Sequence, residues 1–249
     1  MKPQVKWAGG ILLIFALVAL ALLLLGRSNS AFQQNVIFGK GGGEDLRLDM
    51  AVPVHISGPF PAIVCIHGGA WRSGDKSSYK QKIIDFADHG YVAVSINYRL
   101  APQHKFPSQV EDVKCAVRYL RAHATEFKID PTRIAAVGDS AGGHLALMLG
   151  LMDPADGLEG DGGYPEQSSK VQAVVNYYGP TDLAMNEKWS DGVKAQAGYF
   201  LGTNDPTAPV VHRASPVTYI DNADPPVLTF HGTETRWFLS LRLDDYMSY

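Results

Sequence analysis

Five consecutive residues near the middle of the chain have the types and spacing of a nucleophile turn. Gly138-Asp139-Ser140-Ala141-Gly142 is a G-x-S-x-G sequence between the strand-like run RIAAV and the helix-like run GHLALMLGL. A serine on a sharp turn from strand to helix needs flanking glycines, because the tight backbone leaves no room for side chains. The turn raises the hydroxyl above the sheet edge. Ser140 is therefore our candidate nucleophile for acyl transfer.

A second element could complete that chemistry. The segment HGGAW, His67 to Trp71, directly follows the apolar run PAIVCI. An acyl-transfer intermediate carries an oxyanion, and backbone N–H groups that are already in position stabilise it by about 3–4 kcal/mol each. We predict that the N–H groups of Gly69, Ala70 and Ala141 form this oxyanion hole.

Neighbouring polar and aromatic residues have simpler interpretations. Asp139 is expected to hold the turn rather than to act as a catalytic acid, because its side chain should project away from the Ser140 hydroxyl. His67 and His144 are expected to be hydrogen-bonded scaffold histidines. Trp71 fits either a wall of the acyl pocket or the hydrophobic core.

The elements that must position these residues alternate between β and α. Short β-branched runs and longer helical patterns follow one another, which is typical of a doubly wound α/β domain with a mostly parallel sheet and helices on both faces. We expect strands at 35–38, 46–52, 61–69, 91–100, 133–140, 171–180 and 225–233, and helices at 78–89, 107–124 and 141–151. Residues 182–214 have only a weak pattern.

Three motifs, in this order, carry a family resemblance. HGGAW, NYRLAPQHKFP and GDSAGGH resemble the exported carboxylesterases of the α/β-hydrolase superfamily, on the side related to hormone-sensitive lipase and to feruloyl and acetyl-xylan esterases. The resemblance extends from about Gly39 to Glu234. It implies a serine hydrolase that cleaves short-chain acyl esters through an acyl-enzyme, with a Ser-Asp-His triad and no cofactor.

The end of the chain departs from that family pattern. Relatives place the triad acid just after the last strand seen here and the catalytic histidine further on, whereas no histidine follows His231 and no aspartate follows Glu234 directly. We interpret the triad acid and histidine as absent, residues 31–234 as a hydrolase domain lacking its last strand and helix, and the chain as inactive. We hypothesise that a single-base deletion rewrote residues 235–249; a genuine variant terminus is the alternative.

The first thirty residues have the composition of a targeting segment. Lys2 and Lys6 precede an uncharged apolar run over residues 7–25, and small residues lie before Ala31. This pattern fits a signal peptide, while the length of the run, near the roughly 20 residues that span a bilayer, also fits an uncleaved anchor. We expect an exported protein, periplasmic or extracellular, or one anchored to the membrane by residues 7–25.

Composition limits the partners. The net charge is −3 with no basic stripe, so we expect no nucleic-acid partner, and no membrane contact beyond residues 1–30. Cys65 and Cys115, the two cysteines, lie in apolar segments and are expected to be buried thiols. Because no cluster has metal-ligand spacing, we expect no metal, and the family resemblance implies no cofactor.

Three functions remain in competition at this point. The leading one is hydrolysis of a small-molecule ester, with an acetylated or feruloylated carbohydrate as a possible substrate. Two strands fill the short bridge before residue 61, which leaves no room for an N-terminal helical cap and favours an open site for small acyl groups. The alternatives are a non-catalytic exported or anchored binding protein, and an amidase or peptidase on the same fold.

Overall fold

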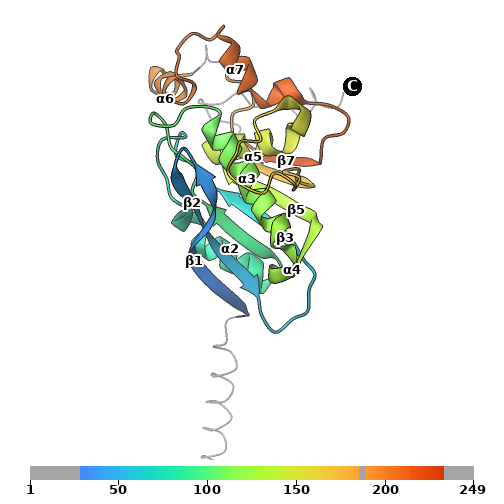
Figure 1. Cartoon of the computed structure of the whole chain (residues 1–249). Helices are drawn as coiled ribbons and strands as arrows, with labels where there is room; N and C mark the ends of the chain where they lie inside the picture. The colour runs from blue at the N-terminus through green and yellow to red at the C-terminus, as the bar shows by residue number, and fades with distance from the viewer. Residues whose placement is uncertain (1–28, 185–188, 233–249) are drawn as a thin grey trace, which may run out of the picture.

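The computed structural model describes residues 29–184 and 189–232, which form one mixed sheet with helices on both faces (Figure 1). In this part of the chain the sheet has seven strands in the order β1-β2-β4-β3-β5-β6-β7. The strands are β1 (Ser30–Gly41), β2 (Glu44–Pro53), β3 (Phe60–Ile66), β4 (Val92–Ile96), β5 (Ile129–Asp139), β6 (Ala173–Tyr177) and β7 (Val227–Phe230). The α-helices are α2 (Lys80–Asp88), α3 (Ser108–Ala122), α4 (Ala124–Phe127), α5 (Ala141–Leu151), α6 (Asp191–Leu201) and α7 (Pro209–Arg213), with short 3-10 turns at Lys76–Tyr79 (η1), Pro154–Asp156 (η2) and Pro216–Tyr219 (η4).

The strand directions agree with the predicted doubly wound α/β sheet. β1 pairs antiparallel with β2, and β2 pairs antiparallel with β4, while β3, β4, β5, β6 and β7 are parallel to one another. The predicted start of β1 at residue 35 was wrong, because pairing with β2 extends back to Ser30 opposite Pro53. The carboxyl ends of β3 and β5 lie side by side, which brings the two predicted motifs to one edge of the sheet.

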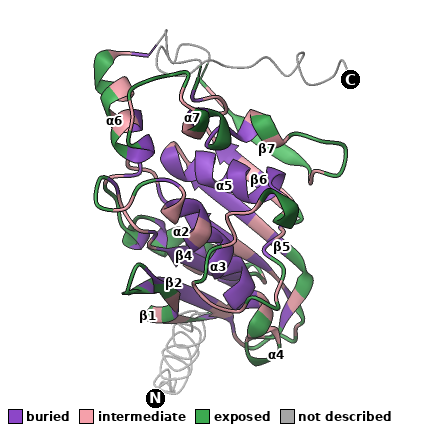
Figure 2. Cartoon of the chain, turned by 45° about the horizontal axis from the view of Figure 1, so that its top comes forward, coloured by how far each residue is buried: buried purple, intermediate pink, exposed green. Residues whose placement is uncertain are grey.

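Two separate hydrophobic clusters cover the two faces of the sheet. The larger cluster includes α3 and α5, which pack on each other and on the central strands, and the smaller one joins α2 to Cys65, Ala93 and Val137. Figure 2 shows α5, α3 and the central strands as the buried middle of the molecule. Burial on both faces explains why β3 has a continuous apolar sequence instead of an alternating one.

The structure corrects the predicted end of one strand and adds two helices to a segment for which the sequence made no assignment. β4 ends at Ile96 and not at residue 100, because the next side chains bond to other segments: Asn97 receives the Lys76 N–H, and Arg99 pairs with Asp112. The weakly patterned residues 182–214 contain α6 and α7, and α6 packs on the core through Phe200.

The prediction of two buried thiols is confirmed. Cys65 and Cys115 are both buried and free. Among residues 29–184 and 189–232 no helix is long and apolar enough to span a membrane. Residues 1–28 of the predicted signal or anchor segment lie outside the described residues, and so does the tail 235–249.

Candidate active site

Ser140 lies on a strained turn between β5 and α5, as the spacing of its glycines predicted. Its backbone angles are φ 51° and ψ −118°, and its side chain does not cap the helix that follows. A Cβ on Gly138 would lie 2.3 Å from the Gly142 carbonyl oxygen, and one on Gly142 would lie 2.0 Å from the Ile66 carbonyl oxygen. Both positions therefore exclude any side chain, and the strain is held at the residue expected to react.

Asp139 ties this turn to the loop after β3. One carboxylate oxygen accepts a hydrogen bond from the Gly68 N–H at 3.2 Å and another from the Tyr79 hydroxyl at 2.8 Å. The carboxylate thus holds the backbone in place, in agreement with the role that the sequence analysis gave it. Tyr79 was not singled out from the sequence, since a single tyrosine before a helix carries no periodic signal.

The loop after β3 turns in the left-handed region of backbone space. Gly69 has φ +118°, and Ala70 and Trp71 have φ 53° and 58°. The turn is closed by the Gly69 carbonyl, which accepts the N–H groups of Arg72 and Ser73, each at 3.0 Å. A Cβ on Gly69 would lie 2.1 Å from the Ser73 carbonyl oxygen, so only glycine fits there. We call residues 68–73 the oxyanion loop.

The predicted oxyanion donors carry unused N–H groups within the described part of the chain. The Gly69 and Ala70 N–H groups donate to no atom of residues 29–184 and 189–232. Ala141 is the first residue of α5, and the first N–H groups of a helix have no partner inside the helix. The positive end of the α5 dipole adds to the attraction for an anion at this point.

His67 and His144 are scaffold histidines with defined partners. The His67 ring stacks on Tyr98 at 4.4 Å, and its Nδ1 lies 2.7 Å from the Gly68 carbonyl oxygen. His144 Nδ1 lies 3.2 Å from the Trp71 indole Nε1, and its Nε2 lies 2.7 Å from the Ala214 carbonyl oxygen. Burial lowers the pKa of both imidazoles, that of His144 to about 4.

Trp71 belongs to the core. Its side chain is only 5% exposed and stacks on Phe200 of α6 with ring centroids 4.5 Å apart. The neighbouring Arg72 extends toward the same helix, where it bonds to Gln196 and lies over the Tyr199 ring. Of the two interpretations left open by the sequence, the structure supports the core one.

A proton acceptor for Ser140 is missing from this arrangement. No hydrogen bond joins the Ser140 hydroxyl to a histidine or a carboxylate among residues 29–184 and 189–232. These ranges also contain no group of three or more His, Cys, Asp or Glu side chains placed to hold a metal ion. The described site therefore consists of a nucleophile turn and an oxyanion loop.

Comparison with known proteins identifies the family. The family model described as BD-FAE matches residues 48–237, which include the oxyanion loop and the nucleophile turn. The chain belongs to the BD-FAE family. BD-FAE proteins are esterases of the α/β-hydrolase superfamily, and the resemblance found in the three motifs is thereby confirmed.

Curated relatives of this BD-FAE protein are named as esterases. Esterase LipC of Mycobacterium tuberculosis is 34% identical over 188 residues, which are 70% of this chain and 44% of LipC. Neutral cholesterol ester hydrolase 1 of Rattus norvegicus is 44% identical over 94 residues, 36% of this chain and 23% of the relative. The chain thus spans less than half the length of the curated relatives it matches.

Solved structures similar to this BD-FAE chain are also esterases. A truncated form of a carbohydrate esterase from gut microbiota is 29% identical with a TM-score of 0.71, over 83% of this chain and 78% of that one. Esterase 2 of Thermogutta terrifontis, phosphonylated by cyclosarin, is 30% identical with a TM-score of 0.65, over 80% of this chain and 70% of that one. Both support the α/β-hydrolase fold.

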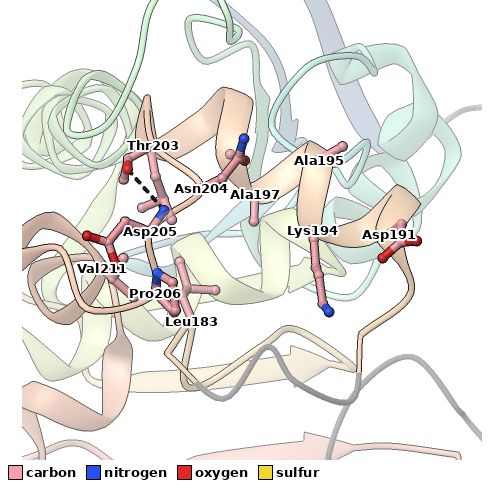
Figure 3. Close-up of a pocket in the computed structure, with 12 residues that line it drawn as sticks. Leu183, Asp191, Lys194, Ala195, Ala197, Thr203, Asn204, Asp205, Pro206 and Val211 are labelled. Carbon is pink, nitrogen blue, oxygen red and sulfur yellow. Dashed lines mark hydrogen bonds between the residues drawn. The ribbon is translucent and has the colours of Figure 1, made fainter.

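Of two cavities in the described part of the BD-FAE domain, one adjoins the site. One, of about 450 Å³, adjoins the nucleophile turn through Asp139 and is also lined by Gly68, Tyr79, Lys82 and Tyr178. The other, of about 420 Å³, lies between α6 and the turn after it (Figure 3). Ser140 and the oxyanion loop do not line the second cavity, so it is separate from the candidate chemistry.

Proposed function

We propose that the protein is a serine carboxylic-ester hydrolase with Ser140 as nucleophile. The observation that carries the proposal is the strained turn at Ser140 beside a loop whose Gly69 and Ala70 N–H groups are unused within the described residues. The names of its relatives as esterases and carboxylic ester hydrolases support the same reaction class.

The reaction would proceed in two steps. Ser140 Oγ forms a bond to the acyl carbon of the ester while its proton passes to a base, and the alcohol leaves with a proton. Water then cleaves the acyl–serine ester and releases the carboxylic acid. In both steps the N–H groups of Gly69, Ala70 and Ala141 would stabilise the negative oxygen.

The turnover of the 249-residue chain depends on its base. Within residues 29–184 and 189–232 no histidine or carboxylate bonds to the Ser140 hydroxyl, and His67 and His144 have other partners, so we infer that the proton of Ser140 passes to solvent or to an added base. Loss of a triad member leaves a residual rate about 10³–10⁴-fold above that in water. We therefore expect slow hydrolysis by this chain, and we expect added imidazole to accelerate it.

Short acyl esters of carbohydrates are the proposed substrate class. Strands β1 and β2 fill residues 30–53, so this segment supplies no helical cover over the site. The similar carbohydrate esterase supports a sugar as the alcohol half. Acetylated and feruloylated sugars remain the two candidates.

A comparison of acyl chain lengths tests this function. In the presence of imidazole, we expect the wild-type chain to cleave 4-nitrophenyl acetate and butyrate faster than the octanoate ester. We expect Ser140→Ala to cleave them no faster than imidazole does without protein. Equal rates for wild type and Ser140→Ala would overturn the esterase proposal. Faster octanoate turnover would overturn the short-acyl part alone.

A non-catalytic binding protein is the second candidate. It is favoured by the absence, within the described residues, of any histidine or carboxylate bonded to Ser140. Tight binding of an acetylated or feruloylated oligosaccharide without acylation, even with imidazole, would place this function first.

Export is proposed on the sequence of residues 1–30 alone. Their basic start and apolar run fit either cleavage or anchoring. Fractionation of the producing cells, with N-terminal sequencing of the mature protein, distinguishes the two.

A further inference from the structure

His144 lies at the junction of three segments that meet beside Ser140. It follows Ser140 by one helical turn, and its backbone N–H donates to the Ser140 carbonyl at 3.0 Å. Its ring contacts Trp71 of the oxyanion loop and the Ala214 carbonyl, which follows α7. The imidazole therefore connects the nucleophile helix, the oxyanion loop and the excursion between β6 and β7.

The two partners of the ring allow only one form of it. An indole N–H can only donate, so His144 Nδ1 must be the unprotonated acceptor. A carbonyl oxygen can only accept, so Nε2 must carry the proton and donate to Ala214. A doubly protonated ring would direct an N–H toward the Trp71 N–H. The contacts thus require the neutral Nε2–H tautomer.

The oxyanion loop needs such an external support. Ala70 and Trp71 both have positive φ, and a residue other than glycine in that region costs about 1–3 kcal/mol unless its surroundings hold it. Three contacts hold Trp71: its carbonyl accepts the Ala101 N–H, its ring stacks on Phe200, and its indole N–H donates to His144. The bond to His144 connects the loop directly to α5, the helix that follows Ser140.

We infer that His144 is a positioning residue for the oxyanion loop, acting through the Trp71 indole to hold the Gly69 and Ala70 N–H groups toward Ser140. The claim that His144 holds the oxyanion loop in place rests on the hydrogen bonds alone. The claim that this affects the reaction at Ser140 rests on the proposed function. His144 does not exchange a proton with substrate in this role. It sets where the loop lies relative to the nucleophile.

Hydrogen exchange on the whole 249-residue chain tests the structural part. The reporters are the Arg72 and Ser73 amides, which close the loop on the Gly69 carbonyl, and the NMR signal of the Trp71 indole N–H. We expect His144→Phe to shift the indole signal and to speed exchange at both amides about tenfold. His144→Gln, which keeps an acceptor and a donor, should restore part of the protection.

Two further variants separate positioning from general loss of stability. Trp71→Phe keeps an aromatic ring against Phe200 but removes the indole donor, so it should speed the same two amides, and combining it with His144→Phe should add little. His123→Phe is the matched control, because His123 follows α3 and its ring hydrogen-bonds to the Tyr119 carbonyl and not to the oxyanion loop. Should His144→Phe not fold, Trp71→Phe carries the test.

Unchanged exchange at Arg72 and Ser73 in the folded His144→Phe and Trp71→Phe proteins would overturn the inference. The catalytic part is measured by the rate at which a fluorophosphonate probe labels Ser140 in the presence of imidazole. We expect His144→Phe to lower the maximal labelling rate about tenfold with the probe's half-saturating concentration unchanged. A wild-type chain that is never labelled contradicts the proposed function, whereas the exchange result still decides the role of His144.

Discussion

The middle of the parallel sheet and its β7 end differ in how well the fold covers them. Val64 and Ile66 of β3 are fully buried in the larger hydrophobic cluster, whereas Leu228 and Phe230 of β7 are 54% and 47% exposed. The nucleophile turn and the oxyanion loop follow the covered strands. The comparison teaches that the backbone geometry needed for chemistry is concentrated where packing can hold strained residues in place.

The largest effect is expected from a side chain at the crowded nucleophile turn. In Gly142→Ala the new Cβ would meet the Ile66 carbonyl oxygen, a backbone atom of the central sheet, so we expect a loss of about 3 kcal/mol in unfolding free energy. Gly192→Ala is the control, since its nearest atom is 3.9 Å away and alanine favours the α6 helix. Urea unfolding measures both. Equal stabilities would show that the turn is not tightly packed.

The second-largest effect is expected from acid, which should lower the free energy of unfolding through the buried His144. The pKa of His144 falls to about 4 in the folded state, below the ordinary value of 6.5, because the ring is buried. The unfolded chain therefore binds a proton more readily, and stability decreases as pH falls from about 6.5 to 4, by up to about 3 kcal/mol. The pKa of His67 is lowered by burial as well, so its contribution has the same sign.

The pH effect is assigned by comparing variants. His144→Gln should reduce the slope of unfolding free energy against pH between 4 and 6.5, leaving the part due to His67. Urea titrations at several pH values give both slopes. Identical slopes for wild type and His144→Gln would contradict the buried neutral ring.

A smaller effect is expected where Asp139 joins the two loops. Asp139→Ala leaves the Gly68 N–H and the Tyr79 hydroxyl without their acceptor, which should cost about 2 kcal/mol. Tyr79→Phe removes one of the two bonds and should cost about 1 kcal/mol. Thermal unfolding provides the measurement. A larger loss for Tyr79→Phe than for Asp139→Ala would show that Tyr79 acts by another route.

The smallest change in stability is expected at β7. Because the Leu228 side chain is exposed, Leu228→Lys should alter the unfolding free energy by no more than about 0.5 kcal/mol. The added charge on an exposed apolar edge strand should reduce association between copies, seen by light scattering over a concentration series. A loss above about 2 kcal/mol would mean that Leu228 is covered in solution, and the contrast with β3 would disappear.

The sequence predicted best where local rules and packing agree. Helix α5 begins and ends at the predicted residues, Ala141 and Leu151, because a glycine-flanked turn precedes a continuous apolar run. The end of β4 was misjudged because Tyr98 and Arg99 look strand-like but bond to the His67 carbonyl and to Asp112. Side-chain bonds to distant residues leave no periodic signal.

The motifs of the site could be predicted from the sequence, but the distant residues that pack on them could not. Glycine spacing located Ser140 and the oxyanion loop, since the steric exclusion at Gly138 and Gly69 acts between residues only four apart in sequence. Tyr79 and Phe200, which contact Asp139 and Trp71, belong to segments about 60 and 130 residues away from those partners. Such contacts depend on how the chain closes over long distances, which a single sequence does not encode locally.

The most direct test of the account is mass spectrometry of the chain after reaction with a fluorophosphonate and imidazole. Attack by Ser140 Oγ on phosphorus displaces fluoride and leaves a stable adduct. We predict one adduct per chain, located at Ser140, formed faster with imidazole and absent from Ser140→Ala. No adduct under any condition, or the same labelling in Ser140→Ala, would contradict the claim that this turn carries the nucleophile.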